Sequence, residues 1–407
     1  MAGAGAFGRN HLRVLRELGL AGEGAALVAA VEPDAARAEE ASKQYGIPVF
    51  PTIEQLLRAD LKLDAACVAV PTVQHYEVAA ALLDTGLDLL VEKPLAATLA
   101  EADDLIARAE RGKRIVQPGH LERFNPAVLA VEPNLKRPMF FEAHRLSVFT
   151  PRALDVDVVL DLMIHDLDIV LTFAKSAVRE VRAVGLPILS PKVDIANVRV
   201  EFESGCVANF TASRVSTERV RKLRFFEPRQ YVSIDYARRD VLVIRINDDV
   251  VKSGDGAADD NAQLAEAATE FLSTGKLDAA VIQKLLAGGK IPAGLMIKVL
   301  GAKNDPEKLK EIAKGFAGPQ ASPEPGPGNS AGTTPAPGLS FVKPEVTPGE
   351  PLKLEIQSFL DSVRTRREPR VTARQGRAAL ELALTIQATM AAHAERAGLG
   401  DFFKSGL

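Results

Sequence analysis

The sequence predicts two folds in succession: a doubly wound parallel α/β sheet, then an α+β domain with a mainly antiparallel sheet. From residue 1 to about residue 119, short apolar runs alternate with amphipathic stretches, a pattern typical of βαβ crossovers. After about residue 139, apolar and polar residues alternate one by one, which indicates half-buried strands. The 407 residues are also more than one compact domain usually holds.

The first region contains four short apolar runs that we interpret as buried strands, at residues 26–31, 65–70, 89–91 and 115–116. Helices are expected between them, at residues 35–45, 75–85 and 99–111. Strands joined by such crossover helices run parallel, and the helices cover both faces of the sheet.

A glycine motif, Gly3-x-Gly5-x-x-Gly8, opens this region, with Phe7 in the same turn. The glycines permit a tight turn and close approach of a pyrophosphate, whose charge the next helix favours with its N-terminal amides. Glu32 ends the second predicted strand, where it can accept hydrogen bonds from an adenosine ribose. The tripeptide Glu32-Pro33-Asp34 offers carboxylates and no arginine for a 2′-phosphate, so NAD is favoured over NADP. Residues 1–119 are therefore assigned to a dinucleotide-binding Rossmann domain.

The start of the chain departs from this pattern. The motif should follow a strand, but only Met1 and Ala2 precede Gly3. We therefore expect the first, central strand to be missing from the chain as given. Its neighbours on both sides would lose ladder partners, and the unpaired backbone groups would lower stability.

Two other predicted strands end in residues that suit a cofactor site. Ligands of doubly wound sheets bind outside the carboxyl ends of the parallel strands, so we expect these turns to face the cofactor crevice. The residues are Glu92 and Lys93 of a Glu-Lys-Pro turn, and Pro71, Thr72 and His75 after the preceding strand.

The second region is predicted to hold a helix at 160–173 and strands at 198–202, 206–214, 231–235 and 241–246. Residues 252–338 are interpreted as a helical insert that ends in a disordered Pro/Gly-rich linker. Further helices are expected at 351–365 and 373–393. Residues 120–251 and 339–407 are assigned to one α+β domain for substrate binding and oligomerisation.

Polar residues in this second region suggest a reaction site. Asp161 and His165 stand four apart in the predicted helix, so one face would carry both and the carboxylate could orient the imidazole. Arg123 and Asn125 lie in a polar segment at the junction of the two regions, which suits a loop presented to a cleft.

Charged and metal-binding candidates are weaker. A zinc site of Glu142, His144 and His165 lacks any supporting spacing, and we expect no metal. Candidate partners for an anionic substrate are Arg145, Arg152, Arg214 and Arg224.

Taken together, these motifs resemble the glucose–fructose oxidoreductase / inositol dehydrogenase / MocA (Gfo/Idh/MocA) family, over residues 1–250 and 339–393. The resemblance implies that Lys93, Asp161 and His165 form the catalytic group and that a nicotinamide cofactor oxidises a sugar or cyclitol hydroxyl. It also implies a homodimer or homotetramer. Residues 119–128 and 161–171 are similar to the nucleotide-sugar members, which implies a substrate such as UDP-N-acetylglucosamine, oxidised at C3.

The chemistry of hydride transfer gives the same residues distinct roles. A base must remove the hydroxyl proton, and His165 titrates nearest neutral pH. Lys93 would bind the same oxygen and stabilise its developing charge, while Asp161 would hold the imidazole tautomer. Two alternatives stay open: a redox-assisted NAD-dependent glycosidase and a non-catalytic NAD-binding sensor or scaffold.

Composition excludes several other classes. The net charge of −3 and the lack of a long basic run argue against nucleic acid as a partner. Cys67 and Cys206 are far apart and indicate neither a disulfide framework nor a cysteine zinc site. We see no signal peptide and no apolar run of membrane-spanning length, and so expect a cytoplasmic protein. The open face of the antiparallel sheet is the expected oligomer interface.

Overall fold

The computed structural model describes residues 1–150, 156–246 and 339–399. The insert and linker predicted at 252–338 lie outside the described residues. The chain divides into two compact units, residues 1–243 with 342–407 and residues 244–341. The candidate site lies in the first unit.

The first 119 residues form the predicted parallel α/β domain. Strands β3, β4 and β5 pair in parallel, and β1 pairs with β2 in parallel. The strands are β1 (Ala30–Val31), β2 (Val49–Phe50), β3 (Ala65–Val68), β4 (Asp88–Glu92) and β5 (Val116–Gly119). The helices are α1 (Gly8–Leu20), α2 (Ala35–Tyr45), α3 (Ile53–Arg58), η1 (Thr72–Gln74), α4 (His75–Asp84) and α5 (Leu99–Gly112).

The centre of this sheet is held by the first residues of the chain. Ala2 forms parallel bridges to both Val31 and Val68. Its amide donates to the Cys67 carbonyl, and the amide of Gly3 donates to that of Val31, both at 2.8 Å. The prediction that nothing would occupy the centre of the sheet is corrected, because Ala2 joins its two parts there.

The strand predicted at residues 26–31 is correspondingly shorter than expected. Only β1 has ladder partners, and Val28 is 36% exposed.

The second domain is built on an eight-stranded sheet in the order β13-β12-β11-β10-β6-β9-β8-β7. The pairs β7–β8, β8–β9, β6–β10 and β10–β11 are antiparallel, and β6–β9 is parallel, which confirms a mainly antiparallel sheet. The strands are β6 (Phe140–Leu146), β7 (Val178–Leu186), β8 (Ile195–Phe202), β9 (Val207–Ser213), β10 (Val220–Glu227), β11 (Gln230–Asp235), β12 (Asp240–Ile246) and β13 (Leu339–Val342).

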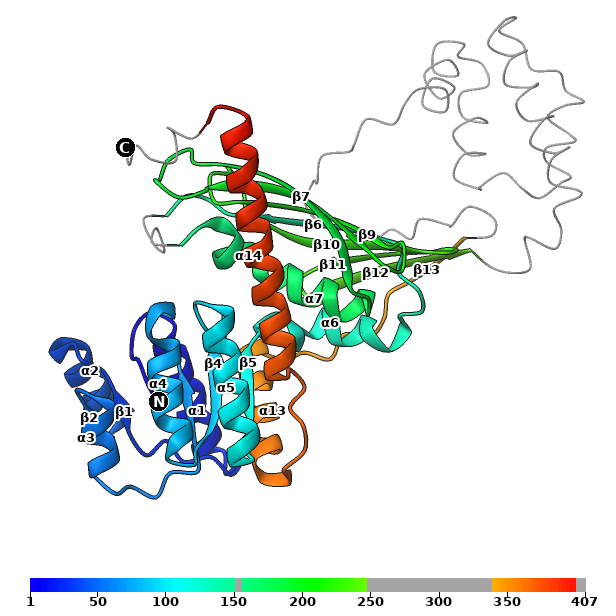
Figure 1. Cartoon of the computed structure of the whole chain (residues 1–407). Coiled ribbons are helices and arrows are strands. Elements are labelled where there is room, and N and C mark those ends of the chain that lie inside the picture. Colours follow the sequence, from blue (N-terminus) through cyan, green and yellow to red (C-terminus); the bar gives the residue numbers. More distant parts are fainter. Residues whose placement is uncertain (151–155, 247–338, 400–407) are drawn as a thin grey trace, which may run out of the picture. The chain divides into compact units, whose positions relative to one another are not determined.

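Helices pack on the apolar face of this sheet. Ala196, Val198, Val200 and Phe202 alternate along β8 and are buried in one cluster with residues of α7 (Ile164–Ala174) and α14 (Ala373–Arg396). Figure 1 shows α14 in red alongside α7 and β7. The remaining helices are η2 (Leu121–Phe124), α6 (Pro126–Val131), η3 (Glu132–Asn134), η4 (Val159–Met163) and α13 (Pro351–Thr365).

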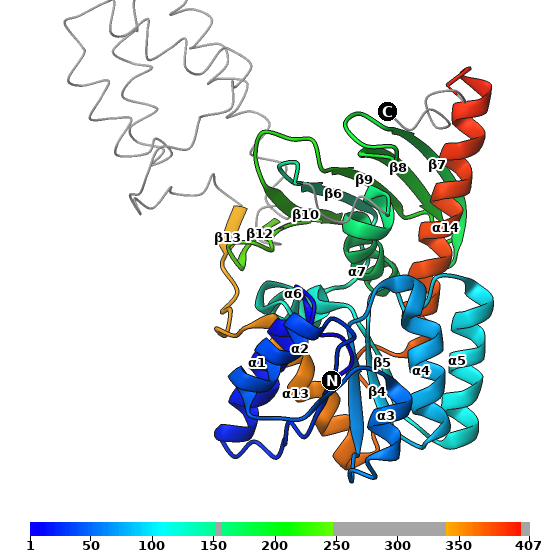
Figure 2. The same cartoon turned by 90° about the vertical axis from the view of Figure 1, so that its left-hand side faces the viewer.

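Helix α13 belongs to the first domain rather than the second. Its residues Leu352, Ile356 and Phe359 are buried in one cluster with Leu12 and Leu18 of α1. Figure 2 shows α13 in orange close to α1. The structure therefore divides the C-terminal segment between the two domains, because the apolar face of α13 covers the dinucleotide-binding sheet.

None of the helices in the described ranges combines the length and apolarity that a membrane span requires.

Candidate active site

A cavity of about 470 Å³ lies at the carboxyl ends of β3, β4 and β5, where these meet the second domain. It is lined by residues from distant parts of the sequence. Those singled out in the sequence are Phe7, Pro71, Thr72, His75, Glu92, Lys93, Asp161 and His165.

The glycine turn beside this cavity has the geometry of a dinucleotide-binding loop. Gly3 has a φ of +90°, and a Cβ there would lie 2.7 Å from the carbonyl oxygen of Ala69. A Cβ on Gly8 would overlap the carbonyl oxygen of Gly3, whereas Gly5 faces open space. Gly3 thus makes the tight turn, and Gly8 allows the start of α1 to pack closely against it. Gly5 leaves room for a pyrophosphate at the N-terminus of α1.

Glu32 lies at the end of β1, as expected for a ribose-binding carboxylate. The buried carboxylate accepts hydrogen bonds from the amides of Ala4 at 2.8 Å and Asp34 at 3.0 Å. Burial opposes the charge, but the bonds from Arg37 and from these amides hold the pKa of Glu32 below its usual value.

The prediction that no arginine lies near the ribose position is wrong, because Arg37 contacts Glu32. Arg37 Nη2 donates to Glu32 Oε1 at 2.8 Å. Asp34 accepts from the Arg37 amide and so caps α2, which turns the first helical arginine back toward Glu32. The spacing of an Asp N-cap followed by an arginine is the signal that could have identified it.

Lys93 connects the first domain to the segment that carries Asp161. Its Nζ donates to the carbonyl oxygens of Asp161 at 2.6 Å and Leu160 at 3.3 Å. The Asp161 carboxylate lies 3.9 Å from the same nitrogen. Burial lowers the pKa of Lys93, although the Asp161 and Glu92 charges oppose this.

His165 lines the cavity without the partner that we expected. Within the described residues, no hydrogen bond joins it to Asp161, and its Nδ1 has no partner. The physical reason is η4, a π-helical turn, in which the wider repeat changes the α-helical spacing on which the predicted pair depended. Burial, and then the charges of Lys93 and Arg145, lower the pKa of His165 well below 6.5, so the imidazole is neutral and able to accept a proton.

Two buried histidines support the cofactor side of the cavity. The ring nitrogens of His75 lie 2.7 Å from the Pro94 carbonyl oxygen and 3.0 Å from that of Val70, so this side chain ties two loops together. His11 Nε2 lies 2.7 Å from Glu92 Oε1. Burial opposes the imidazolium, but contacts with Cys67 and Glu92 raise the pKa of His11 to about 10. The sequence analysis missed His11, which follows the glycine motif by three residues.

Comparisons with known proteins agree with this geometry. The model of an oxidoreductase family with an NAD-binding Rossmann fold, Gfo/Idh/MocA, matches residues 1–120, and that of the GFO/IDH/MocA C-terminal domain matches residues 128–228. The UDP-N-acetylglucosamine 3-dehydrogenase of Acidithiobacillus ferrooxidans is 32% identical over 265 residues, which is 65% of this chain and 82% of that protein. The chain belongs to the Gfo/Idh/MocA family.

Other members of the Gfo/Idh/MocA family are similar over shorter stretches. The scyllo-inositol 2-dehydrogenase (NAD(+)) of Bacillus subtilis is 26% identical and matches 47% of this chain and 61% of its own. A solved structure of the Acidithiobacillus ferrooxidans enzyme aligns with a TM-score of 0.70 and 25% identity over 95% of both chains. The chain is therefore an NAD(P)-binding oxidoreductase, and its relatives are dehydrogenases that act on CH–OH groups.

In this family member, Arg123 and Asn125 do not line the cavity. Both are buried: Arg123 Nη2 donates to the Arg370 carbonyl at 3.3 Å, and Arg123 Nη1 lies 3.5 Å from Asp168. Asn125 caps α6 and donates to the Tyr236 carbonyl at 3.0 Å. Their prediction as substrate ligands is corrected, because these contacts occupy their polar atoms in the domain junction.

The arginines predicted to meet an anionic substrate are also engaged elsewhere. Arg145 donates to Asp166 at 2.7 Å and to Glu122 at 3.1 Å, and Arg224 to Glu142 at 3.1 Å. Arg152 lies outside the described residues. Among the residues described, no cluster of three or more His, Cys, Asp or Glu could hold a metal ion.

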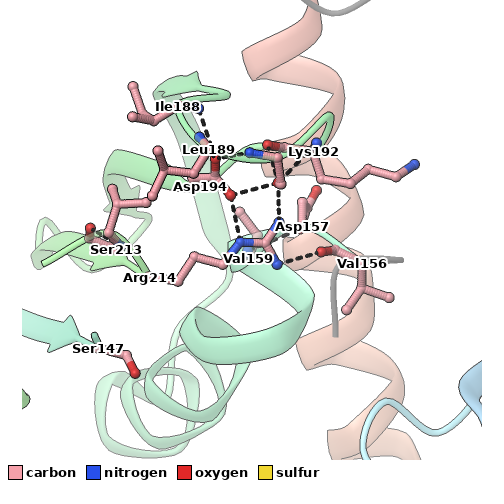
Figure 3. A network of polar contacts seen from close by, with 12 residues as sticks. Ser147, Val156, Asp157, Val159, Ile188, Leu189, Lys192, Asp194, Ser213 and Arg214 are labelled. Atoms are coloured by element: carbon pink, nitrogen blue, oxygen red, sulfur yellow. Dashed lines mark hydrogen bonds and ion pairs between the residues drawn. The ribbon is translucent and has the colours of Figure 1, made fainter. Parts of the chain in front are cut away.

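Arg214 stabilises the start of the segment that carries Asp161. Figure 3 shows Asp194 accepting from the Arg214 side chain and from backbone amides of the loop before it. Arg214 also donates to the Val156 carbonyl at 2.9 Å, one residue before Asp157. Asp157 in turn accepts from the amides of Val159 and Leu160 and begins η4. Arg214 is therefore a positioning residue rather than a substrate ligand.

Proposed function

We propose that this protein is an NAD-dependent dehydrogenase that oxidises a hydroxyl of a sugar, namely a nucleotide sugar such as UDP-N-acetylglucosamine at C3. The observation that carries the proposal is the cavity in which Lys93 and His165 lie at the carboxyl ends of the Rossmann strands. The 32% identity to a UDP-N-acetylglucosamine 3-dehydrogenase supports the choice of substrate.

The cofactor side of the site fits NAD. The open position at Gly5 and the N-terminus of α1 would hold the pyrophosphate, and Glu32 would bind the adenosine ribose. Phe7, Pro71 and Thr72 would border the nicotinamide end, where they line the cavity. NAD, when bound, accepts the hydride from the carbinol carbon.

The protein's own residues handle the proton and the charge. His165, neutral near pH 7, accepts the hydroxyl proton at its imidazole nitrogen. Lys93 donates a hydrogen bond to the same oxygen and stabilises its negative charge as the C–H bond breaks. Asp161, 3.9 Å from Lys93 Nζ, holds the ammonium group in place rather than the imidazole.

A direct test measures formation of reduced cofactor from NAD and UDP-N-acetylglucosamine. We expect turnover by the wild type, and a loss of roughly 100- to 1,000-fold in kcat in Lys93→Met, the size of effect seen when one oxyanion donor is removed. NAD affinity should remain. Release of free sugar without net reduction of NAD would favour the glycosidase alternative, and NAD binding without turnover of any sugar would favour the sensor.

The oligomeric state stays a prediction. We expect a homodimer or homotetramer through the outer face of the eight-stranded sheet. A particle mass in solution equal to one chain of 43.5 kDa would contradict it.

A further inference from the structure

Arg221 differs from the other arginines of the site because it lines the cavity without a protein partner. It lies on β10 directly across from Arg145 of β6 in the antiparallel register. It borders the same cavity as Lys93 and His165. Within the described ranges, its guanidinium makes no hydrogen bond or ion pair with another residue.

The nearby carboxylates are committed to Arg145. Asp166 accepts from Arg145 Nε at 2.7 Å and from Nη2 at 2.9 Å, while Glu122 accepts from Nη1 at 3.1 Å. Like charges directly opposite each other in a sheet are unfavourable. Burial and the Arg145 charge accordingly lower the pKa of Arg221. An anion bound at Arg221 would offset both the repulsion between the two guanidinium groups and the cost of partly burying the Arg221 charge.

The position of Arg221 indicates which part of a substrate would carry that anion. Arg221 as a residue is exposed and its guanidinium only partly buried, whereas Lys93 and His165 of the same lining are half-buried, so Arg221 belongs to the outer part of the lining. The half-buried part of the lining holds Lys93, Asp161 and His165, to which the proposed oxidation assigns the reacting carbinol. A phosphoryl group attached to the sugar and extending outward would therefore meet Arg221.

We propose that Arg221 binds a phosphoryl group of the substrate and thereby selects a phosphorylated sugar, such as a nucleotide sugar, over an uncharged sugar or cyclitol. This inference rests on the proposed oxidation of a sugar hydroxyl in the same cavity. The planar guanidinium, with its paired N–H donors, suits two phosphoryl oxygens at once.

The test uses UDP as a probe that carries the phosphoryl groups but no sugar. UDP is titrated by calorimetry into protein saturated with NAD, so that the dinucleotide site is filled. We expect Arg221→Gln to weaken UDP binding about 10- to 100-fold, the loss expected for a charge-assisted hydrogen bond, and Arg221→Lys to restore part of it. Lys222→Gln is the matched control: it removes the same charge from the next residue of β10, which does not line the cavity, and should leave UDP binding unchanged.

Kinetics separate this inference from the proposed function. In Arg221→Gln, at a pH well above the acidic limb, we expect KM for UDP-N-acetylglucosamine to rise by the same factor and kcat to change much less, whereas Lys222→Gln should leave KM and kcat unchanged. Equal UDP binding by wild type and Arg221→Gln would overturn the role of Arg221 even if UDP-N-acetylglucosamine is oxidised. Arg221-dependent UDP binding without oxidation of any sugar would uphold the phosphoryl site and contradict the proposed function.

Discussion

Glu32 and Arg37 together determine how the site meets the adenosine ribose. The Glu32 carboxylate is in place to accept ribose hydroxyls, and Arg37 Nη2 is held against it at 2.8 Å. The Glu32 carboxylate would repel the 2′-phosphate of NADP, and the Arg37 guanidinium would attract it. The proposed preference for NAD would therefore depend on Glu32 holding Arg37.

Removing Glu32 should shift the cofactor preference. In Glu32→Ala we expect kcat/KM for NAD to fall and that for NADP to rise, each about 10-fold, consistent with one charged hydrogen bond. Steady-state kinetics with both cofactors measure this. In the double variant Glu32→Ala/Arg37→Ala the gain with NADP should vanish, and a gain that persists would show that Arg37 does not contact the phosphate.

His165 should set the acidic limit of activity. Because burial and neighbouring cations lower its pKa well below 6.5, kcat/KM for sugar oxidation should be undiminished at pH 6.5 and fall only at lower pH, as the imidazole becomes protonated. The unfolded chain binds this proton more tightly, so the same group reduces the free energy of unfolding as the pH falls below 6.5.

A pH profile in the wild type and Arg221→Gln tests this assignment. The charge of Arg221 contributes to the lowered pKa, so its removal should move the acidic limb to higher pH. A limb that lies above pH 6.5 in the wild type, or that does not move in the variant, would count against His165 as the base.

At the scale of elements, the helices and strands were largely predictable, and the departures have local causes. The predicted spans of α2 and α13 match the structure: Asp34 caps the start of α2, and α13 begins at Pro351 with its apolar face buried. The π-helical turn η4 was not predictable, since it results from tertiary contacts and gives no distinct sequence period. Strands β6, β7 and β10 were not among the predicted strands, and Arg221 was missed because it lies on β10.

The residues of the candidate site were also predictable only in part. Strand ends such as Glu92 and Lys93 were predictable because chain topology alone brings them to one edge of the sheet. Arg123 and Asn125 were misplaced because a polar segment at a domain junction can be buried by mutual hydrogen bonds as readily as exposed in a cleft.

The pair of Asp194 and Arg214 should be important for stability as well as for positioning η4. Asp194 is fully buried, and Asn in its place would leave the Arg214 charge without its carboxylate. We expect Asp194→Asn to lower the free energy of unfolding by roughly 3–5 kcal/mol in urea denaturation. Asp240→Asn, which alters an exposed pair with Lys343, is the control and should cost about 0.5 kcal/mol or less. Similar losses in both variants would contradict the role of the buried pair.

At the scale of the whole molecule, the described residues combine a family fold with a reaction site at the junction of its two domains. Lys93 from the first domain and His165 from the second line one cavity, and Lys93 is hydrogen-bonded to the carbonyl of Asp161. Neither domain alone carries both of the residues to which we assign oxygen binding and base catalysis. The central claim is that the two domains together remove a hydride and a proton from one sugar carbinol.

Transfer of deuterium measures that step most directly. The protein is incubated with NAD and UDP-N-acetylglucosamine deuterated at C3, and the reduced cofactor is analysed by mass spectrometry and NMR. The account predicts one deuterium on the nicotinamide ring from the wild type and none detectable from Lys93→Met in the same time. Reduced cofactor without deuterium, or label transfer undiminished in Lys93→Met, would contradict it.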